Sequence, residues 1–269
     1  MKRDPVVIAL RAYPVSNTSV IAWFLSPSDG LIRLMAKGHR RFEKRGFEGG
    51  IDIGSVGEIV YIPRRDDTPG ILAEWAETHR PDGISESRGR FAAFCAACDF
   101  VALAAQPGLP APELFALLIR LIDRLQSRTL TPDTTGLLLF GFLTDFFKIN
   151  GIQLRLDRCA ICGQPPLPSD RLRIAPSLGG LVIARLLPPS FRGAALPISP
   201  DARAILQRIA RDGVRLPIAR LKLSVRQRNN IVRVLFQILC DLFERMPRSL
   251  RALYRSLWPG VEFPRAIED

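Results

Sequence analysis

The chain has 269 residues, of which 47% are hydrophobic, so it can bury a core in one large domain or two, and wholesale disorder is excluded. The formal net charge is +12, and residues 201–269 contribute +7 of it, with 14 basic and seven acidic side chains. Such an excess of positive charge predicts a polyanionic partner, either nucleic acid or an anionic membrane surface.

No targeting or spanning segment is predicted. The apolar run Val6–Leu10 stops at Arg11 and is too short for a signal sequence, and the run Gly136–Leu143 stops well before the roughly 20 residues that a spanning helix needs. Five cysteines, an odd number, do not indicate a secreted disulfide framework. We therefore expect a cytoplasmic protein without a membrane partner.

Five short strands are predicted before residue 80, because apolar residues alternate between turns that are rich in Gly, Pro, Asn and Asp. Gly54 and Gly57 interrupt the fourth of them and predict bulges or bends. This pattern favours a five-stranded Greek-key barrel of the OB type, with an SH3-like barrel as the alternative. The predicted strands cover residues 5–12, 18–25, 30–37, 51–62 and 71–78.

The stretch from Gly30 to Arg45 combines a predicted strand with a basic loop. Cations alternate with apolar residues on the strand, and Gly38 then opens a loop with a run of positive charge. A solvated loop is the ordinary explanation of a charge run, but the total charge favours contacts to phosphates, with little base specificity and strong salt dependence. The candidate DNA contacts are Arg33, Lys37, Arg40, Arg41, Lys44 and Arg45, followed by Arg11, Arg64 and Arg65.

Aromatic side chains in a polar loop can stack on bases. Phe42 and Phe47 lie in the basic loop and are the candidates for base stacking. Trp23 lies in the middle of the second predicted strand, a position at which a large aromatic is more often part of the core.

From about residue 88 the apolar period changes to that of helices. Helices over 91–106, 112–127 and 135–150 are expected to form one bundle, the last of them being central and buried, and further helices are predicted over 200–213 and 224–246. A loop-rich insert occupies about 157–198. We therefore predict an α+β protein with an OB-fold nucleic-acid-binding domain at 1–80 and an α-helical domain at 81–269 that carries the insert.

No enzyme motif is present. The chain contains neither a phosphate-binding Gly-x-x-x-x-Gly-Lys-Ser/Thr loop nor a Gly-x-Gly-x-x-Gly turn, and neither of its two histidines is near a plausible nucleophile. We predict that the protein is not an enzyme. Cys95 and Cys98 fall in an alanine-rich helical run and are interpreted as core residues, whereas Cys159 and Cys162 open the insert.

The order of these parts resembles the RecO family of recombination mediator proteins. The residues that carry the resemblance are Ala36, Lys37, Gly38, Arg40 and Arg41 in the barrel, the segment from Asn150 to Gly163, and the Ser177–Gly180 turn. The resemblance implies a protein that binds single- and double-stranded DNA, anneals complementary strands, binds RecR and the acidic tail of single-stranded-DNA-binding protein, and helps RecA load on coated DNA. It also implies a nucleoid-associated protein of DNA repair.

The resemblance raises the question of zinc. Many members of the family have a second Cys-x-x-Cys after the Gly-Gly turn, where this chain has Ile183 and Leu186. A structural zinc ion needs four ligands, and Cys159 and Cys162 provide only half a site. We therefore expect no required cofactor, and a small apolar contact in place of the metal.

Two alternatives to the mediator stay open. An RNA- or ribosome-associated OB-fold protein would use the same basic groove, and only the 2′-hydroxyl would distinguish the two ligands. The second alternative is a scaffold protein whose basic C-terminal helices bind an acidic tail. This function overlaps with that of the mediator.

Overall fold

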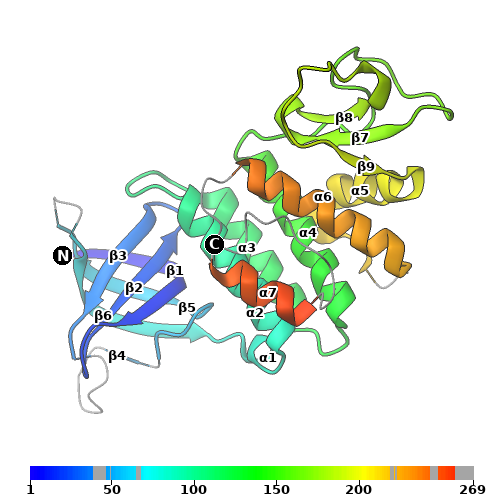
Figure 1. Cartoon of the computed structure of the whole chain (residues 1–269). Coiled ribbons are helices and arrows are strands. Elements are labelled where there is room, and N and C mark those ends of the chain that lie inside the picture. The colour runs from blue at the N-terminus through cyan, green and yellow to red at the C-terminus, as the bar shows by residue number, and fades with distance from the viewer. Residues whose placement is uncertain are drawn as a thin grey trace. The chain divides into compact units, whose positions relative to one another are not determined.

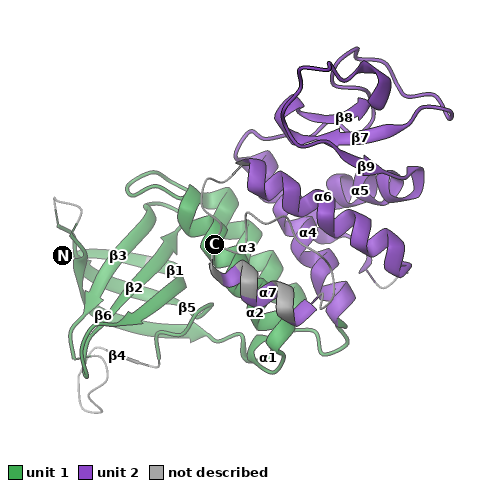
Figure 2. Ribbon diagram, in the orientation of Figure 1, with its two compact units in different colours: residues 1–131 green, residues 132–269 purple. Residues whose placement is uncertain are grey.

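The structure is a computed structural model of the whole chain, and it describes residues 1–38, 47–48, 50–64, 68–218, 221, 223–242 and 248–257. The chain forms two compact units, Met1–Thr131 and Pro132–Asp269 (Figures 1 and 2). The first contains the β-barrel and three helices, and the second contains four helices and a small sheet among its described residues.

The first unit is built on a closed five-stranded barrel. The strand order is β3-β2-β1-β5-β6, and parallel pairing of β3 with β6 at Leu34↔Gly70 and Met35↔Ile71 closes it. This is the ring order of the OB-type Greek-key barrel, so the predicted α+β fold with an OB-type barrel is confirmed. The strands are β1 (Lys2–Pro14), β2 (Val20–Ser26), β3 (Gly30–Ala36), β5 (Val56–Ile62) and β6 (Gly70–His79), with the short β4 (Phe47–Glu48) paired to β6.

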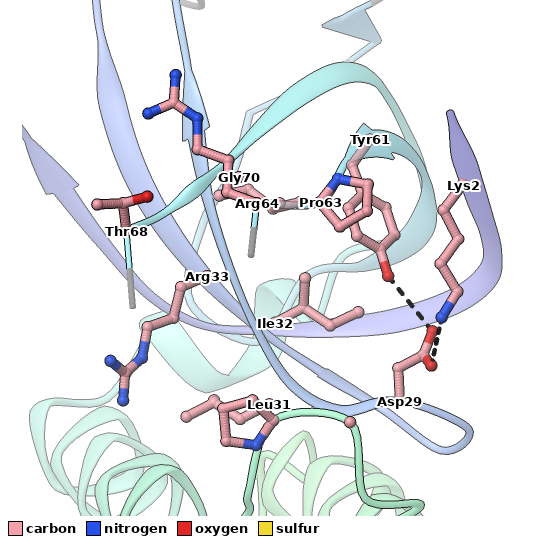
Figure 3. A pocket seen from close by; sticks show the side chains of 13 residues that line it. Lys2, Asp29, Leu31, Ile32, Arg33, Tyr61, Pro63, Arg64, Thr68 and Gly70 are labelled. Atoms are coloured by element: carbon pink, nitrogen blue, oxygen red, sulfur yellow. Dashed lines mark hydrogen bonds and ion pairs between the residues drawn. The ribbon is translucent and has the colours of Figure 1, made fainter. Parts of the chain in front are cut away.

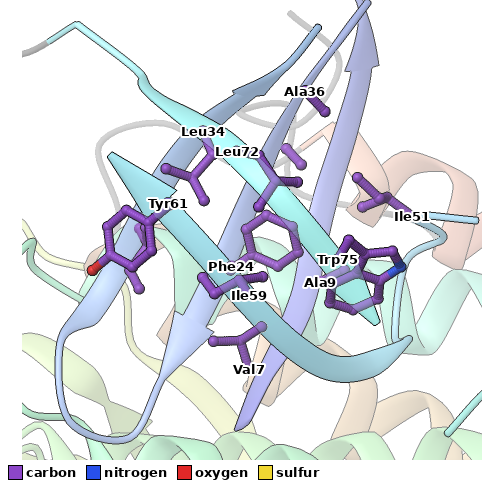
Figure 4. Close-up of a cluster of buried hydrophobic side chains, with 12 residues drawn as sticks. Val7, Ala9, Phe24, Leu34, Ala36, Ile51, Ile59, Tyr61, Leu72 and Trp75 are labelled. Atoms are coloured by element: carbon purple, nitrogen blue, oxygen red, sulfur yellow. The ribbon is translucent and has the colours of Figure 1, made fainter. Parts of the chain in front are cut away.

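The barrel core contains side chains from all five strands (Figure 4). Phe24 and Trp75 are its largest fully buried side chains, and their ring centroids lie 5.5 Å apart. The buried indole N–H of Trp75 donates to the carbonyl of Gly50 at 3.2 Å, which satisfies its polar atom. Gly57 packs directly against this ring, since a Cβ there would lie 2.7 Å from it.

The fourth predicted strand is shorter than expected at its start. β5 begins at Val56 rather than at residue 51, because Gly54 adopts a φ of +92° and its N–H donates to the carbonyl of Ala9 at 2.8 Å. The bend predicted at Gly57 is present, as the β5–β6 register shifts between Val56 and Gly57.

Three helices complete the first unit: α1 (Asp82–Ser85), α2 (Arg88–Ala104) and α3 (Pro112–Leu125). Ser87 caps α2 by accepting the N–H of Arg90, at 3.5 Å. The guanidinium of Arg90 is 6% exposed and donates to the carbonyls of Leu125 and Ser127, at 3.4 and 3.1 Å. It therefore satisfies the orphan carbonyls at the end of α3 and ties that end to α2.

The turn between β2 and β3 meets the loop between α2 and α3 backbone to backbone. The N–H of Leu31 donates to the carbonyl of Gln106 at 3.2 Å, and the N–H of Gly108 donates to the carbonyl of Asp29 at 2.9 Å. Gly30 has a φ of +65°, and a Cβ there would lie 2.2 Å from the Gln106 carbonyl oxygen. Only glycine permits this approach.

The second unit contains α4 (Pro132–Ile149), α5 (Pro200–Asp212), α6 (Val225–Leu242) and α7 (Arg248–Leu257). Its insert forms a sheet of order β8-β7-β9, with β7 (Leu172–Ala175), β8 (Gly180–Ile183) and β9 (Leu196–Ile198). The prediction that α4 forms one bundle with α2 and α3 is wrong, because α4 belongs to the second unit. A separate helix α7 was also not predicted.

The apolar helix α4 is largely buried, as predicted, but its surroundings belong to the second unit. Gly141 lets it approach the turn after α5 so closely that a Cβ there would lie 2.2 Å from the Gly213 carbonyl oxygen. The carboxylate of Asp145 on α4 accepts the N–H of Val214 at 2.9 Å. The apolar surface of α4 is therefore covered by other elements of the second unit, as expected for a helix that is apolar almost all round.

Two glycine substitutions test the junction in the first unit. Gly30→Ala should destabilise the protein by about 3 kcal/mol, because it adds a steric overlap to the strain of a positive φ. Gly108→Ala is the control, since Gly108 has a φ of +75° but no atom within 4 Å of an added Cβ, and it should cost about 1 kcal/mol. Urea unfolding measures both, and equal losses would contradict the close approach.

Candidate nucleic-acid interface

Three side chains form a row across the outer face of the barrel. Arg11 on β1 is the register partner of Trp23 on β2, which is in turn the partner of Arg33 on β3. The guanidinium carbons of Arg11 and Arg33 lie 4.9 and 4.6 Å from the centroid of the Trp23 ring. Both cations are therefore within cation–π range of one indole.

A bulge in β1 creates this row. Val7 and Ala9 point into the barrel core, so strict alternation would also turn Arg11 inward. The β1–β2 register shifts between Ala9 and Arg11, and Ala12 then packs against the core instead. The bulge thereby places Arg11 on the outer face, beside Trp23.

The row is anchored to α2 by an ion pair. Asp99 accepts Nε of Arg11 at 2.8 Å, and its distance to the second guanidinium nitrogen is 2.6 Å. The two side chains are only 21% and 18% exposed, so water and salt screen them less than an exposed pair. Asp99 holds Arg11, Arg11 supports the indole of Trp23, and the indole supports Arg33, whose side chain is exposed.

Trp23 is thus on the outer face, and the interpretation that it belongs to the core is wrong. It is half-buried, while its neighbours Ala22 and Phe24 point into the barrel. Tyr13, which is 47% exposed, meets it edge-on with ring centroids 6.4 Å apart. The alternation of β2 could have indicated this orientation, but only the strand register reveals the two arginines beside the ring.

A hollow of about 400 Å³ lies next to this row (Figure 3). Arg33 reaches it from β3, Arg64 from the segment after β5, and Lys2 from the start of β1. Its walls include Ile32, Pro63 and Pro107, so apolar surface lies between the cations. This combination suits a ligand that carries both a phosphate and a flat apolar group.

The one acid that lines the hollow among the described residues is already paired. Asp29 accepts Nζ of Lys2 at 2.5 Å and the hydroxyl of Tyr61 at 3.3 Å. Burial, and then the negative charge of Asp29, raise the pKa of the Tyr61 hydroxyl, which therefore stays protonated and donates. Arg33 and Arg64 have no such neutralising acid within the hollow.

The structure brings several of the predicted DNA contacts together. Arg33 and Arg64 share the hollow, and Arg11 supports Arg33 through Trp23. Lys37 is exposed in the turn directly after β3. Sequence reasoning did not select Lys2 or Trp23. The predicted contacts Arg40, Arg41, Lys44, Arg45 and Arg65 and the stacking candidate Phe42 lie outside the described residues, and Phe47 is described only as backbone of β4.

The predicted half metal site lies in the second unit, away from these cations in the chain. Cys159 is fully buried, Cys162 is exposed, and the N–H of Ile183 donates to the Cys159 sulfur at 3.5 Å. Burial alone would raise the pKa of Cys159, but backbone hydrogen bonds from Ile183, Cys162 and Ile161 lower it. No group of three potential metal ligands occurs among the described residues.

The other Cys-x-x-Cys pair is part of the core of the first unit, on α2. Cys98 is 1% exposed, and burial raises its pKa well above the ordinary value. Burial likewise raises the pKa of Cys95 to about 11. These thiols are protonated near neutral pH and therefore poor ligands and nucleophiles.

The barrel is closed, of the OB type and joined to helices, and cations cluster on one side of it. These features define an OB-fold protein with a helical extension. Proteins of this class often bind oligonucleotides. Comparison with known proteins narrows this class. The family described as "Recombination protein O C terminal" matches residues 85–251, more than half of the chain. The chain belongs to the RecO family, whose members are proteins of recombination and DNA repair.

Individual relatives agree with this assignment. A protein of Rhodopirellula baltica named DNA repair protein RecO is 28% identical over 205 residues, which cover 76% of this chain and 74% of that protein. A Synechococcus protein of the same name is 27% identical over 183 residues, which cover 65% of this chain and 59% of that protein. Of the helices that the structure describes, none has the length and apolar character needed to cross a membrane.

The anchoring of the row can be measured with a double-mutant cycle on Arg11 and Asp99. Replacing each by Ala, singly and together, should give a coupling energy of about 1–3 kcal/mol, because the pair is mostly shielded from water. Arg128 and Glu86 form a control pair at a similar distance, 2.7 Å, with 81% and 41% exposure, and should couple by about 0.5 kcal/mol or less. Equal coupling in the two pairs would refute a special role for Asp99.

Proposed function

We propose that this protein is a DNA-binding recombination mediator that binds single- and double-stranded DNA through the barrel and anneals complementary strands. It acts by binding and has no reaction of its own. The observation that carries the proposal is the juxtaposition of Arg33, stacked on Trp23, with Arg64 at the rim of one hollow. Membership of the RecO family supports the same function.

The stacked row favours binding because it prepares Arg33 for a phosphate. A free arginine loses rotamer entropy when it binds, whereas the indole already restricts the guanidinium plane. The donors at the edge of the guanidinium stay available for phosphate oxygens, because Asp29, the one acid among the described residues that line the hollow, is paired with Lys2 and Tyr61. Lys37, which is exposed directly after β3, would add a further phosphate contact.

Annealing needs the charge of two strands to be neutralised on one protein. The barrel offers one surface, and the second unit offers exposed arginines on its insert and a basic helical region. The exposed cations of the insert are all arginines, which bind phosphate with two parallel hydrogen bonds. They are Arg158, Arg171, Arg173, Arg185 and Arg192.

The resemblance to the family extends the proposal to partners. The protein would act with RecR, and the basic helices of the second unit would dock the acidic tail of single-stranded-DNA-binding protein by charge complementarity. This combination would bring the mediator to coated DNA in the nucleoid and assist the loading of RecA. Zinc is not part of the proposal.

Arg33 and Arg64 are the direct test of the barrel surface. Arg33→Glu/Arg64→Glu should weaken binding of a single-stranded oligonucleotide about 10- to 100-fold at 0.1 M salt, and should reduce the slope of log K against log salt by roughly 1.4. Fluorescence anisotropy over a salt series measures both quantities.

The control for this charge reversal is Arg88→Glu at the start of α2. Arg88 is exposed, and an acid is favourable in the first turn of a helix, so this variant should fold normally and bind DNA nearly as well as the wild type. If the control and the double variant lose affinity equally, binding depends on total charge rather than on this surface.

The main alternative, an RNA-associated OB-fold protein, is tested by competition between DNA and RNA of one sequence. Because the proposed contacts are to phosphates and flat base faces, a single-stranded DNA should compete at least as well as the RNA. Anisotropy with labelled DNA and unlabelled competitors measures the ratio. A preference of tenfold or more for RNA would favour the alternative.

A further inference from the structure

The Cys159–Cys162 segment forms a tight turn that is held in place by backbone hydrogen bonds. The N–H of Gly163 donates to the carbonyl of Cys159 at 2.8 Å, and Gly163 has a φ of +72°. The N–H of Ala160 donates to the carbonyl of Leu181 on β8 at 2.7 Å. These backbone hydrogen bonds therefore form the turn and attach it to the sheet of the insert.

The two thiols of this turn are close together but differ in access. Cys159 is fully buried, and its sulfur accepts hydrogen bonds from the N–H of Ile183 and from the side chain of Cys162. Cys162 itself is exposed to solvent. One thiol can thus be reached by a reagent, and the second lies beside it.

The surroundings of the turn do not fit a structural zinc ion. Ile183, which stands at one position of the missing thiol pair, is 3% exposed, and its side chain has no ligand atom. Leu186, at the other position, is likewise apolar. The nearby acid Asp170 already accepts the N–H of Leu167 at 2.8 Å and pairs with Arg185. Two thiolates remain, where a structural zinc site needs four ligands.

We propose that Cys159 and Cys162 are a reversible dithiol–disulfide pair, and that this turn is a thiol modification site in place of a zinc site. The oxidant is a small-molecule disulfide. The sulfur of Cys162 attacks one sulfur of the reagent, and the first reagent thiolate leaves and takes up a proton. The sulfur of Cys159 then attacks that of Cys162, so the intramolecular bond forms and the second reagent thiol is released. The protein loses two hydrogens, and the reagent is reduced to two thiols.

The chain contains its own control for this proposal. Cys95 and Cys98 have the same spacing, but they lie within helix α2, and Cys98 is 1% exposed. A disulfide reagent cannot reach Cys98 without local unfolding. Spacing alone would predict that both pairs react, whereas accessibility and the turn geometry select Cys159 and Cys162.

The experiment uses the reduced full-length protein. It is incubated with glutathione disulfide, and one aliquot is acidified and analysed by intact mass. The rest is quenched with N-ethylmaleimide in denaturant, so that every remaining thiol is alkylated, and its tryptic peptides are mapped. We expect a species 2 Da lighter before alkylation, with a bond between Cys159 and Cys162, while Cys95, Cys98 and Cys240 carry the maleimide. In the reduced protein, Cys162 should react with maleimide about tenfold or more faster than Cys98.

Two variants and a metal titration complete the test. Cys162→Ser should abolish the lighter species, and Cys95→Ser/Cys98→Ser should leave it unchanged. Zinc is added to the reduced protein, and bound metal is measured by atomic emission after desalting. Retention of one zinc ion per chain with protection of Cys162 from maleimide would overturn the proposal, and so would a bond between Cys95 and Cys98 or full alkylation of Cys159 and Cys162 after oxidation.

Discussion

The structure of the first unit depends on one close approach, between the β2–β3 turn of the barrel and the loop that joins α2 to α3. Gly30 permits this approach because it has no side chain, and backbone hydrogen bonds from Leu31 and Gly108 hold it. The ion pair between Arg11 and Asp99 adds a side-chain link from β1 to α2. A small barrel with a modest core is thus supported by helices along one side, which limits how β1, β2 and β3 can move. The cations on these strands are presented on a supported surface rather than on a free loop.

The DNA-binding surface that we propose consists of few residues. Trp23 is used as a support for cations, with Arg11 and Arg33 near its ring, and only Arg33 is left exposed beside the hollow. Asp29, which would otherwise weaken the positive field of the hollow, is paired with Lys2 and Tyr61. Contacts of this kind depend on phosphate charge and on salt, and carry little information about base sequence. Such behaviour suits a protein of recombination, which must act on DNA of any sequence.

The two Cys-x-x-Cys pairs show how surroundings decide the chemistry of one spacing. On α2 the thiols belong to an alanine-rich core, where burial raises the pKa of both and makes them inert. In the insert, a tight turn exposes Cys162 and surrounds the sulfur of Cys159 with N–H donors. The buried residue Ile183 lies beside this turn, and its N–H donates to the Cys159 sulfur. A motif search on the sequence gives equal weight to both pairs.

The sequence by itself determined the class of fold and most of the longer elements, but not α1, α7 or the strands of the insert. Alternation with period two predicted the strands of the barrel, and the change to a helical period predicted α2 to α6, because both periods follow from backbone geometry that neighbouring residues share. The excess of positive charge and the cations of β3 could also be read directly. The division into units could not be read from the sequence. Helix α4 was expected to pack with α2 and α3, but it belongs to the unit of the C-terminal helices.

Only the tertiary structure decided which of these residues meet. The bulge after Ala9 turns Arg11 outward, and the register of β1, β2 and β3 places it beside Trp23 and Arg33. The hollow brings together Lys2, Arg33 and Arg64, although Lys2 and Arg64 are more than 60 residues apart in the sequence. Local periodicity specifies the face of a strand but not its register or its partners, since these depend on bulges and on contacts between residues far apart in sequence.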